Sequence, residues 1–342
     1  AEIALKFGAE GIGLLRIERM FRKPERLELL RKVILAETKD ERIKYLEPLA
    51  DMIKEDFKEI FKIMNSKPVI VRLIDPPLHE FLPKPDEILQ EIYELKARGT
   101  PESVIKEKEW LLRRVRALQE ANPMLGHRGV RVGVTHPEFY YYLSKAILEA
   151  TAELIKEGYN PVVEIMIPQV SEVNEIRYVK QKAIIPALED TEKKYNVKLD
   201  VKIGTMVETV RACLMDEIAK EVDFLSFGTN DLTQATFSFS RDDVENKFLP
   251  IYLQEKIMAF NPFQTLDVKG VGKLIEIAVK AAREANPKIE IGICGEHGGD
   301  ADSIMFLYKV GLDYVSASPF RVPVARLAAA QATLKYSKSL NT

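Results

Sequence analysis

The sequence lacks the features that mark membrane proteins, disulfide-stabilised secreted proteins and nucleic-acid-binding proteins. No apolar run is long enough to span a bilayer, and no signal peptide opens the chain. Two cysteines in 342 residues form neither a disulfide framework nor the spacing of a zinc site. The formal net charge of -2 gives no support to nucleic-acid binding, which needs a basic face. We therefore expect a cytoplasmic protein that contacts neither a membrane nor nucleic acid.

The remaining composition is that of a globular protein, with 46% hydrophobic and 30% charged residues. The length suits one large domain or two ordinary ones. Residue 1 is Ala rather than Met, and residues 1–8 have the pattern of the second half of an amphipathic helix. We expect a fragment of a longer polypeptide, with a naturally processed terminus as the alternative.

Seven short apolar segments have the composition of buried parallel strands, and helical periodicity separates them. They lie near residues 11, 69, 162, 201, 224, 289 and 313. This alternation predicts an α/β fold with parallel strands and crossover helices. We expect one domain over residues 1–342, a (β/α)8 barrel of the TIM type whose first strand would precede Ala1. A doubly wound open sheet is the alternative, although its dinucleotide-binding glycine fingerprint is absent.

A charged helical insertion is expected over about residues 86–122, where Thr100-Pro101 marks a fresh helix start. The loop that follows reads N-P-M-L-G-H-R-G and contains Arg128. Loops rich in glycine, proline and cationic side chains often close over a substrate, and an irregular connection is the alternative.

The segment F-L-S-F-G-T-N-D-L-T-Q at residues 224–234 changes abruptly from apolar to polar at Gly228. Hydroxyl, amide and carboxylate side chains follow at Thr229, Asn230 and Asp231. Polar groups in this position suit a ligand site at the carboxyl end of a parallel strand. The alternative is that Asp231 only caps the next helix.

Two other predicted strands also end in residues with chemical capability. V-K-I-G-T-M-V-E ends in Glu208, and I-E-I-G-I-C-G-E-H-G-G-D places Cys294 before a glycine-rich turn. Glu208 and Asp231 could share a hard cation such as Mg2+. Cys294 could act there as a proton donor or nucleophile, although a lone cysteine is more often a small buried residue.

These segments and four others, in the same order, resemble the C-terminal PEP/pyruvate-binding barrel of the phosphoenolpyruvate (PEP)-utilising enzymes. The other motifs are G-A-E-G-I-G-L-L-R from residue 8, R-L-I-D-P-P-L-H-E-F-L-P from residue 72, N-P-M-L-G-H-R-G from residue 122 and S-P-F-R-V-P from residue 318. The resemblance covers essentially the whole chain. The runs D-P-P-L-H-E-F and E-H-G-G-D look like the dikinase branch, because PEP synthase and enzyme I of the sugar phosphotransferase system vary there.

The resemblance implies an anion-binding role for four arginines. Arg16 and Arg72 would clamp the phosphoryl and carboxylate groups of PEP through planar, forked donors. Arg128 would assist phosphoryl transfer, and Arg241 would bind an anion.

It also implies roles for the residues at the ends of three strands. Glu208 and Asp231 would hold Mg2+, which stabilises charge on a substrate oxygen. Cys294 would exchange a proton with carbon 3 of the substrate. The residues expected to contact the substrate from the rim are Gly228, Thr229 and Asn230.

The resemblance implies interconversion of pyruvate and PEP, within a full reaction of ATP, pyruvate and phosphate to AMP, PEP and diphosphate. The sequence contains neither the family's phosphohistidine motif nor a nucleotide-binding segment. We therefore expect only the pyruvate/PEP half-reaction here, with the phosphohistidine on another domain of the same full-length chain, and a homodimer. The alternatives are a PEP synthase or enzyme I barrel, or a catalytically silent barrel retained for dimerisation or regulation.

Overall fold

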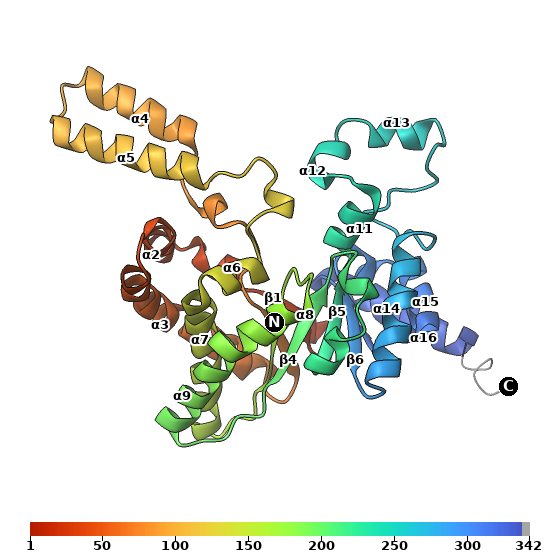
Figure 1. The fold of residues 1–342 in the computed structure, drawn as a ribbon. Coiled ribbons are helices and arrows are strands. Elements are labelled where there is room, and N and C mark those ends of the chain that lie inside the picture. Colours follow the sequence, from red (N-terminus) through yellow and green to blue (C-terminus); the bar gives the residue numbers. More distant parts are fainter. Residues whose placement is uncertain (337–342) are drawn as a thin grey trace.

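A parallel sheet of seven strands forms the centre of the computed structural model, which describes residues 1–336 (Figure 1). The strands are β1 (Ile12–Arg16), β2 (Pro68–Arg72), β3 (Val162–Ile167), β4 (Lys202–Val207), β5 (Phe224–Gly228), β6 (Glu290–Cys294) and β7 (Tyr314–Val315). Each strand pairs with its neighbours in chain order. All seven strands predicted from the sequence are confirmed.

Helices precede, connect and follow the strands. The α-helices are α1 (Glu2–Lys6), α2 (Pro24–Leu35), α3 (Lys39–Met64), α4 (Pro85–Ala97), α5 (Glu102–Leu118), α6 (Val130–Thr135), α7 (Pro137–Lys156), α8 (Val173–Val179), α9 (Ile185–Tyr195), α10 (Ile218–Glu221), α11 (Thr229–Phe237), α12 (Arg241–Val244), α13 (Leu249–Gln254), α14 (Val271–Ala285), α15 (Ala301–Val310) and α16 (Val322–Tyr336). Short 3-10 segments are η1 (Ile17–Arg22), η2 (Leu78–Phe81), η3 (Pro123–Leu125), η5 (Ala212–Leu214), η6 (Glu296–Gly299) and η7 (Pro319–Arg321), and a π-helical segment, η4 (Lys180–Ile184), joins α8 to α9.

The sheet curves into a nearly closed barrel of the TIM type, as the sequence predicts. Gly13 of β1 lies so close to β7 and the residue after it that an added Cβ would be 2.7 Å from Ser316 and 3.3 Å from the Tyr314 ring. The strands are apolar on both faces because each face is covered. A large core fills the space between strands and helices, and a smaller apolar cluster fills the barrel interior. The interior cluster consists of Ile70, Met166, Met206, Phe224 and Cys294.

Two helical excursions leave the barrel after the carboxyl ends of β2 and β5 (Figure 1). The first is the hairpin of α4 and α5, which confirms the predicted helices of the insertion. The second contains α12 and α13 and is packed around its own apolar cluster of Val244, Leu249 and Phe263. No periodic pattern in the sequence predicts this second excursion, because its helices are only four and six residues long.

One segment is less helical than its sequence pattern predicts. Residues 211–222 have helical periodicity, but the structure divides them into η5 and α10. Met215 between them adopts an extended backbone conformation, with φ -113° and ψ 102°, which interrupts the helical hydrogen bonds. Cys213 before this break and Ile218 after it are buried, whereas Leu214 is exposed, so the periodicity reflects burial rather than a continuous helix.

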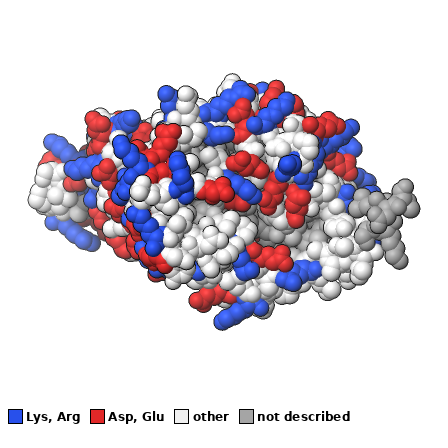
Figure 2. Space-filling model, turned by 90° about the horizontal axis from the view of Figure 1, so that it is seen from below, with Lys and Arg blue, Asp and Glu red and all other residues white. Residues whose placement is uncertain are grey.

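The surface and the cysteines agree with the composition. Positive and negative side chains are intermingled over the face shown in Figure 2. Both cysteines are free and buried. Within residues 1–336, no helix is long and apolar enough to cross a membrane.

Packing inside the barrel gives a stability prediction. A Cβ at Gly204 of β4 would lie 2.5 Å from the Phe224 ring of β5, so Gly204→Ala should lower the free energy of unfolding by about 1–3 kcal/mol. In urea denaturation, the same change made in a Phe224→Leu background should cost less, because the ring is gone. Strictly additive effects would contradict this packing.

Candidate active site

The carboxyl ends of four strands carry predicted site residues to one edge of the sheet. β2 ends at Arg72, and β6 ends at Cys294. Glu208 directly follows β4, and Asp231 lies in the first turn of α11, which begins where β5 ends. The crossover topology thus gathers side chains that are far apart in the sequence.

One carboxylate oxygen joins two of the predicted arginines. Oδ2 of Asp75 is 2.8 Å from a terminal nitrogen of Arg72 and 2.7 Å from one of Arg128. The other terminal nitrogen of Arg128 donates to Oδ1 of Asp231 at 3.2 Å. Burial by itself would lower the pKa of both guanidinium groups, but the neighbouring carboxylates outweigh burial and raise it. Both arginines therefore remain charged inside the protein.

Glu18 accepts a hydrogen bond from the other terminal nitrogen of Arg72. Its Oε1 accepts a hydrogen bond from Arg72 at 3.1 Å and another from the backbone N–H of Asp75 at 3.0 Å. Glu18 and Asp75 are not among the site residues predicted from the sequence. A signal for Asp75 was present, since it is an acidic residue three positions beyond the strand-end Arg72 and just before Pro76-Pro77.

The loop that carries Arg128 approaches the barrel closely because of Gly129. This residue has φ +57°, which favours glycine, and an added Cβ would be 2.6 Å from Cβ of Gln169. Its N–H donates to the carbonyl of Asp75 at 2.9 Å. Gly129 therefore ties the loop to the segment that carries the shared carboxylate.

Glu208 is buried with half of its carboxyl group unpaired. Oε1 accepts a hydrogen bond from the backbone N–H of Gln169 at 2.7 Å, whereas Oε2 has no partner within residues 1–336. Burial, followed by the charges of Asp231 and Asp75, raises the pKa of Glu208 well above its usual value, and Arg72 and Arg128 oppose that rise.

The six charged side chains of the site, called the charged group below, do not balance in charge. They comprise two guanidinium groups and four carboxyl groups, those of Glu18, Asp75, Glu208 and Asp231. If all six were ionised, the excess would be two negative charges. An unpaired buried carboxyl oxygen in a negative surrounding is suited to a cation.

Cys294 lies at the same carboxyl end of the barrel, which we call the barrel mouth, and its thiol is buried. Its Sγ donates to the carbonyl oxygen of Phe227 at 3.5 Å. Burial, with the charge of Glu208 in addition, raises the pKa of Cys294 to about 11, against the opposing effect of Arg72. At neutral pH the thiol is therefore protonated, which suits a proton donor better than a nucleophile.

The three residues after Phe227 fix the ends of β5 and β6. Gly228 lies against Glu208, because an added Cβ would be 2.7 Å from Oε2. The Thr229 hydroxyl donates to the carbonyl of Cys294 at 3.1 Å and is 2.7 Å from Nδ1 of His297. Asn230 Oδ1 is buried and has no partner among the described residues. The expected substrate contacts of Gly228, Thr229 and Asn230 stay predictions.

The remaining two predicted arginines differ in position. Arg16, at the end of β1, is exposed, and residues 1–336 offer its side chain no hydrogen bond or ion pair. It lies near enough to Cys294 to lower the pKa of that thiol slightly against the effect of burial. Arg241 instead pairs with Glu245 at 3.2 Å and lies over the Phe263 ring, so it contacts no member of the charged group.

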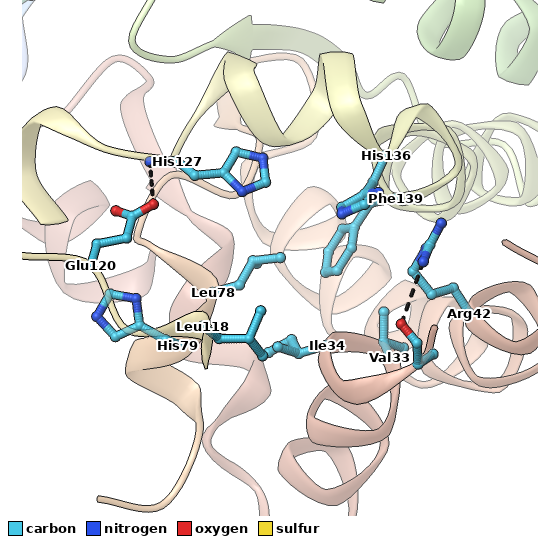
Figure 3. Close-up of a pocket in the computed structure, with 11 residues that line it drawn as sticks. Val33, Ile34, Arg42, Leu78, His79, Leu118, Glu120, His127, His136 and Phe139 are labelled. Carbon is cyan, nitrogen blue, oxygen red and sulfur yellow. Dashed lines mark hydrogen bonds between the residues drawn. The ribbon is translucent and has the colours of Figure 1, made fainter. Parts of the chain in front are cut away.

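A separate cavity of about 70 Å³ lies behind the Arg128 loop (Figure 3). Its lining residues are Val33, Ile34, Ala36, Arg42, Leu78, His79, Leu118, Glu120, His127, His136 and Phe139. None of these belongs to the charged group, although His127 directly precedes Arg128. Glu120 accepts a hydrogen bond from the His127 backbone N–H at 2.7 Å and so fixes the start of this loop.

Residues 1–336 contain no group of three or more His, Cys, Asp or Glu side chains arranged to hold a metal ion. The predicted pair of Glu208 and Asp231 is a smaller set. It is suited only to a cation that takes its other ligands from water or substrate.

The family model and the similar proteins of known name indicate the same family for this chain. The model of the PEP-binding domain of PEP-utilising enzymes matches residues 1–334. The chain is 53% identical over 339 residues to the pyruvate, phosphate dikinase of Entamoeba histolytica, covering 99% of this chain and 38% of that protein. It is 48% identical over 333 residues to that of Clostridium symbiosum, covering 97% and 37%. It is 48% identical over 338 residues to the chloroplastic pyruvate, phosphate dikinase 1 of Arabidopsis thaliana, covering 96% and 33%. The chain thus spans less than two fifths of the length of these relatives.

The shared carboxylate can be tested by its contribution to stability. Asp75→Asn keeps the size of the side chain but leaves Arg72 and Arg128 without their common counter-charge, so the free energy of unfolding should fall by about 3 kcal/mol. Urea denaturation measures the change. Glu28→Gln, which removes an exposed ion pair with Lys32 on α2, is the control and should leave the midpoint unchanged. Equal midpoints for parent and Asp75→Asn would show that the carboxylate is not the structural link.

Proposed function

This chain belongs to the PEP-utilising enzymes through their PEP-binding domain, and we propose that it interconverts pyruvate and PEP at the carboxyl ends of β2, β4, β5 and β6. The observation that carries the proposal is the buried group in which Arg72 and Arg128 share Asp75, beside Glu208, Asp231 and a protonated Cys294. It combines donors for an anion, oxygen ligands for a cation and a proton donor in one barrel mouth.

The arginines would bind the two anionic groups of PEP. Nε of Arg72 and Nε of Arg128 are buried and have no hydrogen-bond partner among the described residues. Buried unpaired donors on charged side chains are costly, so these N–H groups are available to a ligand. Arg16, exposed at the adjacent strand end, adds a third forked donor. Asp75 and Glu18 would fix the orientation of Arg72, which reduces the reorganisation needed on binding.

Mg2+ fits the two carboxyl groups of Glu208 and Asp231, which lie beside the arginines. Oε2 of Glu208 lacks a partner, and Asp231 is a hard oxygen donor on the neighbouring strand end. Two carboxylates with the remaining positions left to water and substrate match the preference of this ion. When bound, Mg2+ would supply electrostatic stabilisation for negative charge that develops on a substrate oxygen.

Cys294 would exchange a proton with carbon 3 of the substrate. Its raised pKa keeps the proton on Sγ until the carbon becomes basic, and the apolar neighbours Ile70, Met166, Met206 and Phe224 exclude water from beneath it. Gly228 and Asn230 would border the substrate on the β5 side.

The relatives are named pyruvate, phosphate dikinase, and the proposal extends to the complete reaction that this name implies. The phosphoryl group would come from a phosphohistidine on another domain of the same full-length chain, with ATP and phosphate consumed there. We further propose a cytoplasmic homodimer. The rivals are a PEP synthase or enzyme I activity and a silent barrel. The complete gene product would be assayed with ATP plus phosphate, ATP plus water and a small phosphocarrier protein, and dependence on phosphate would support the dikinase.

The metal assignment predicts that Glu208→Ala and Asp231→Ala each abolish Mg2+-dependent binding of oxalate, which resembles enolpyruvate. Each change removes one of two carboxylate ligands. Calorimetric titration with Mg2+ and with a chelator present measures the dependence. Glu217→Ala, which removes an exposed carboxylate beside α10, is the control and should bind as the parent does. Unchanged oxalate affinity in both site variants would refute the assignment.

The proton-donor assignment predicts a separation between binding and exchange. Cys294→Ser should bind Mg2+ and oxalate normally, but release of tritium from methyl-labelled pyruvate should slow on the order of 10²–10⁴-fold, because a hydroxyl is a far weaker acid than a thiol. Cys213→Ser changes the other buried cysteine, outside the mouth, and should exchange at the parental rate. Parental exchange in Cys294→Ser would mean that another residue supplies the proton.

A further inference from the structure

Gln169, just beyond the end of β3, has a backbone conformation that its residue type rarely adopts. Its φ is +59°, in the left-handed region where a Cβ is crowded and glycine or asparagine is usual. Within residues 1–336, four other residues that are not glycine have a positive φ, and all of them are exposed: Asn65, Asn196, Ser238 and Lys256. Gln169 is instead buried, with 4% of its surface exposed. A costly conformation inside the protein indicates that the surrounding structure holds it in place.

This conformation directs the backbone N–H of Gln169 at Glu208. The N–H donates to Oε1 of Glu208 at 2.7 Å in a buried hydrogen bond. Oε2 of the same carboxyl group lies on the side of β5, because a Cβ added to Gly228 would be 2.7 Å from it. Asp231 follows Gly228 by three residues, in the first turn of α11. The hydrogen bond from Gln169 therefore leaves the unpaired oxygen on the side of the second proposed metal ligand.

The side chain of Gln169 packs against the loop that carries Arg128. A Cβ added to Gly129 would be 2.6 Å from Cβ and 2.9 Å from Cγ of Gln169, and 3.2 Å from the carbonyl oxygen of Pro168. The same carbonyl oxygen accepts a hydrogen bond from the N–H of Val130 at 3.0 Å. Residues 129 and 130 thus hold the two residues after β3, one by packing and the other by a hydrogen bond.

Two hydroxyl groups fix the backbone on either side of this turn. The Thr205 hydroxyl donates to the carbonyl of Ile167 at 2.9 Å, and the Thr209 hydroxyl donates to the carbonyl of Val170 at 2.8 Å. Thr205 lies in β4 and Thr209 directly follows Glu208, so both belong to the segment that carries the carboxyl group. The turn is therefore tied to the Glu208 segment at three points, and its contact with Gly129 ties it to the Arg128 loop.

We propose that Gln169 is a positioning residue for the cation site: its backbone N–H orients Glu208, and the packing of its side chain on Gly129 holds that N–H in place. The proposal rests on the proposed function, in which Glu208 binds Mg2+. Gln169 acts through Glu208 and makes the orientation of this carboxyl group depend on the position of the Arg128 loop. Partners that orient a metal-binding side chain typically contribute about 10–100-fold to metal affinity.

Gln169→Gly and Gln169→Met separate the packing of the side chain from its amide group, and both keep the backbone N–H. Gln169→Gly removes the atoms that pack on Gly129, so its affinity for Mn2+ in the presence of oxalate should fall about 10-fold. Gln169→Met retains Cβ and Cγ and should bind Mn2+ as the parent does. Electron paramagnetic resonance of free Mn2+ measures the affinity in the complete gene product, and the binding that Glu208→Ala removes identifies the site.

Gly129→Ala tests the same contact from the loop. The added methyl group would displace Gln169, so Mn2+ affinity should fall about 10-fold although Gly129 is not a proposed metal ligand. The decrease should be smaller in a Gln169→Gly background, because the atoms that the methyl group meets are gone. Gly99→Ala is the matched control. Gly99 has φ +69° and no atom within 4 Å of an added Cβ, so this variant has a strained backbone without the contact and should bind Mn2+ as the parent does.

Three results would overturn the positioning role and leave the proposed metal site standing. They are parental Mn2+ affinity in Gln169→Gly, with or without a change in thermal midpoint, equal losses in Gln169→Gly and Gln169→Met, and strictly additive effects of Gly129→Ala and Gln169→Gly. If Gly129→Ala does not fold, the two Gln169 variants decide the question. If Glu208→Ala removes no Mn2+ binding from the parent protein, the proposed metal site fails and the positioning role fails with it.

Discussion

The rest of the site depends on the sharing of one carboxylate oxygen of Asp75 between Arg72 and Arg128. The two arginines come from different connections of the barrel, the end of β2 and the loop before α6, and the contact fixes them relative to each other. Burying two guanidinium groups is expensive, and a single shared oxygen cannot saturate both. Their unpaired Nε groups and the unpaired oxygen of Glu208 are what the protein fold leaves unsatisfied. Leaving these groups unpaired lowers the stability of the empty protein. An anionic ligand and a cation, bound together, would supply the missing partners.

The barrel separates the two kinds of charge that the reaction would move. Phosphoryl and carboxylate charge would enter from the mouth, where Arg72 and Arg128 lie. The proton for carbon 3 would come from Cys294, whose buried thiol belongs to the apolar cluster of the barrel interior. Glu208 affects both parts of the site. Its charge raises the pKa of the Cys294 thiol, and it adds to the negative charge of the barrel mouth.

Much of this arrangement could be predicted from the sequence, because the strands are short apolar runs that end in a residue with a distinct chemistry. Glu208, Asp231 and Cys294 are found in this way, since parallel strands share one carboxyl edge, whereas the resemblance to the family supplied Arg72. Glu18 and Asp75 were missed because their role is defined by partners that no local pattern reveals. Residues 211–222 show a further limit, since burial on one side produces helical periodicity whether or not the backbone continues as a helix.

The closeness of Ser226 and Tyr314 on either side of β6 was also beyond the sequence. Ser226 stands in an apolar strand and Tyr314 in a two-residue strand, and only the register across Gly292 brings them together. Arg241 shows the converse case, in which a motif residue lies beside Glu245 and Phe263 rather than in the charged group. Its anion-binding role would need a movement of α12, and it stays a prediction.

The central claim is that the excess negative charge beside Arg72 and Arg128 is a cation site that completes a PEP/pyruvate pocket. The most direct measurement is a crystal structure of the protein grown with Mn2+ in place of Mg2+ and with oxalate, using anomalous scattering to locate the metal. The account predicts a single strong anomalous peak within coordination distance of both Glu208 and Asp231, with oxalate between that peak and the arginines. A peak confined to another place, such as the histidine-lined cavity behind the Arg128 loop, or oxalate bound without any metal beside Glu208, would contradict it.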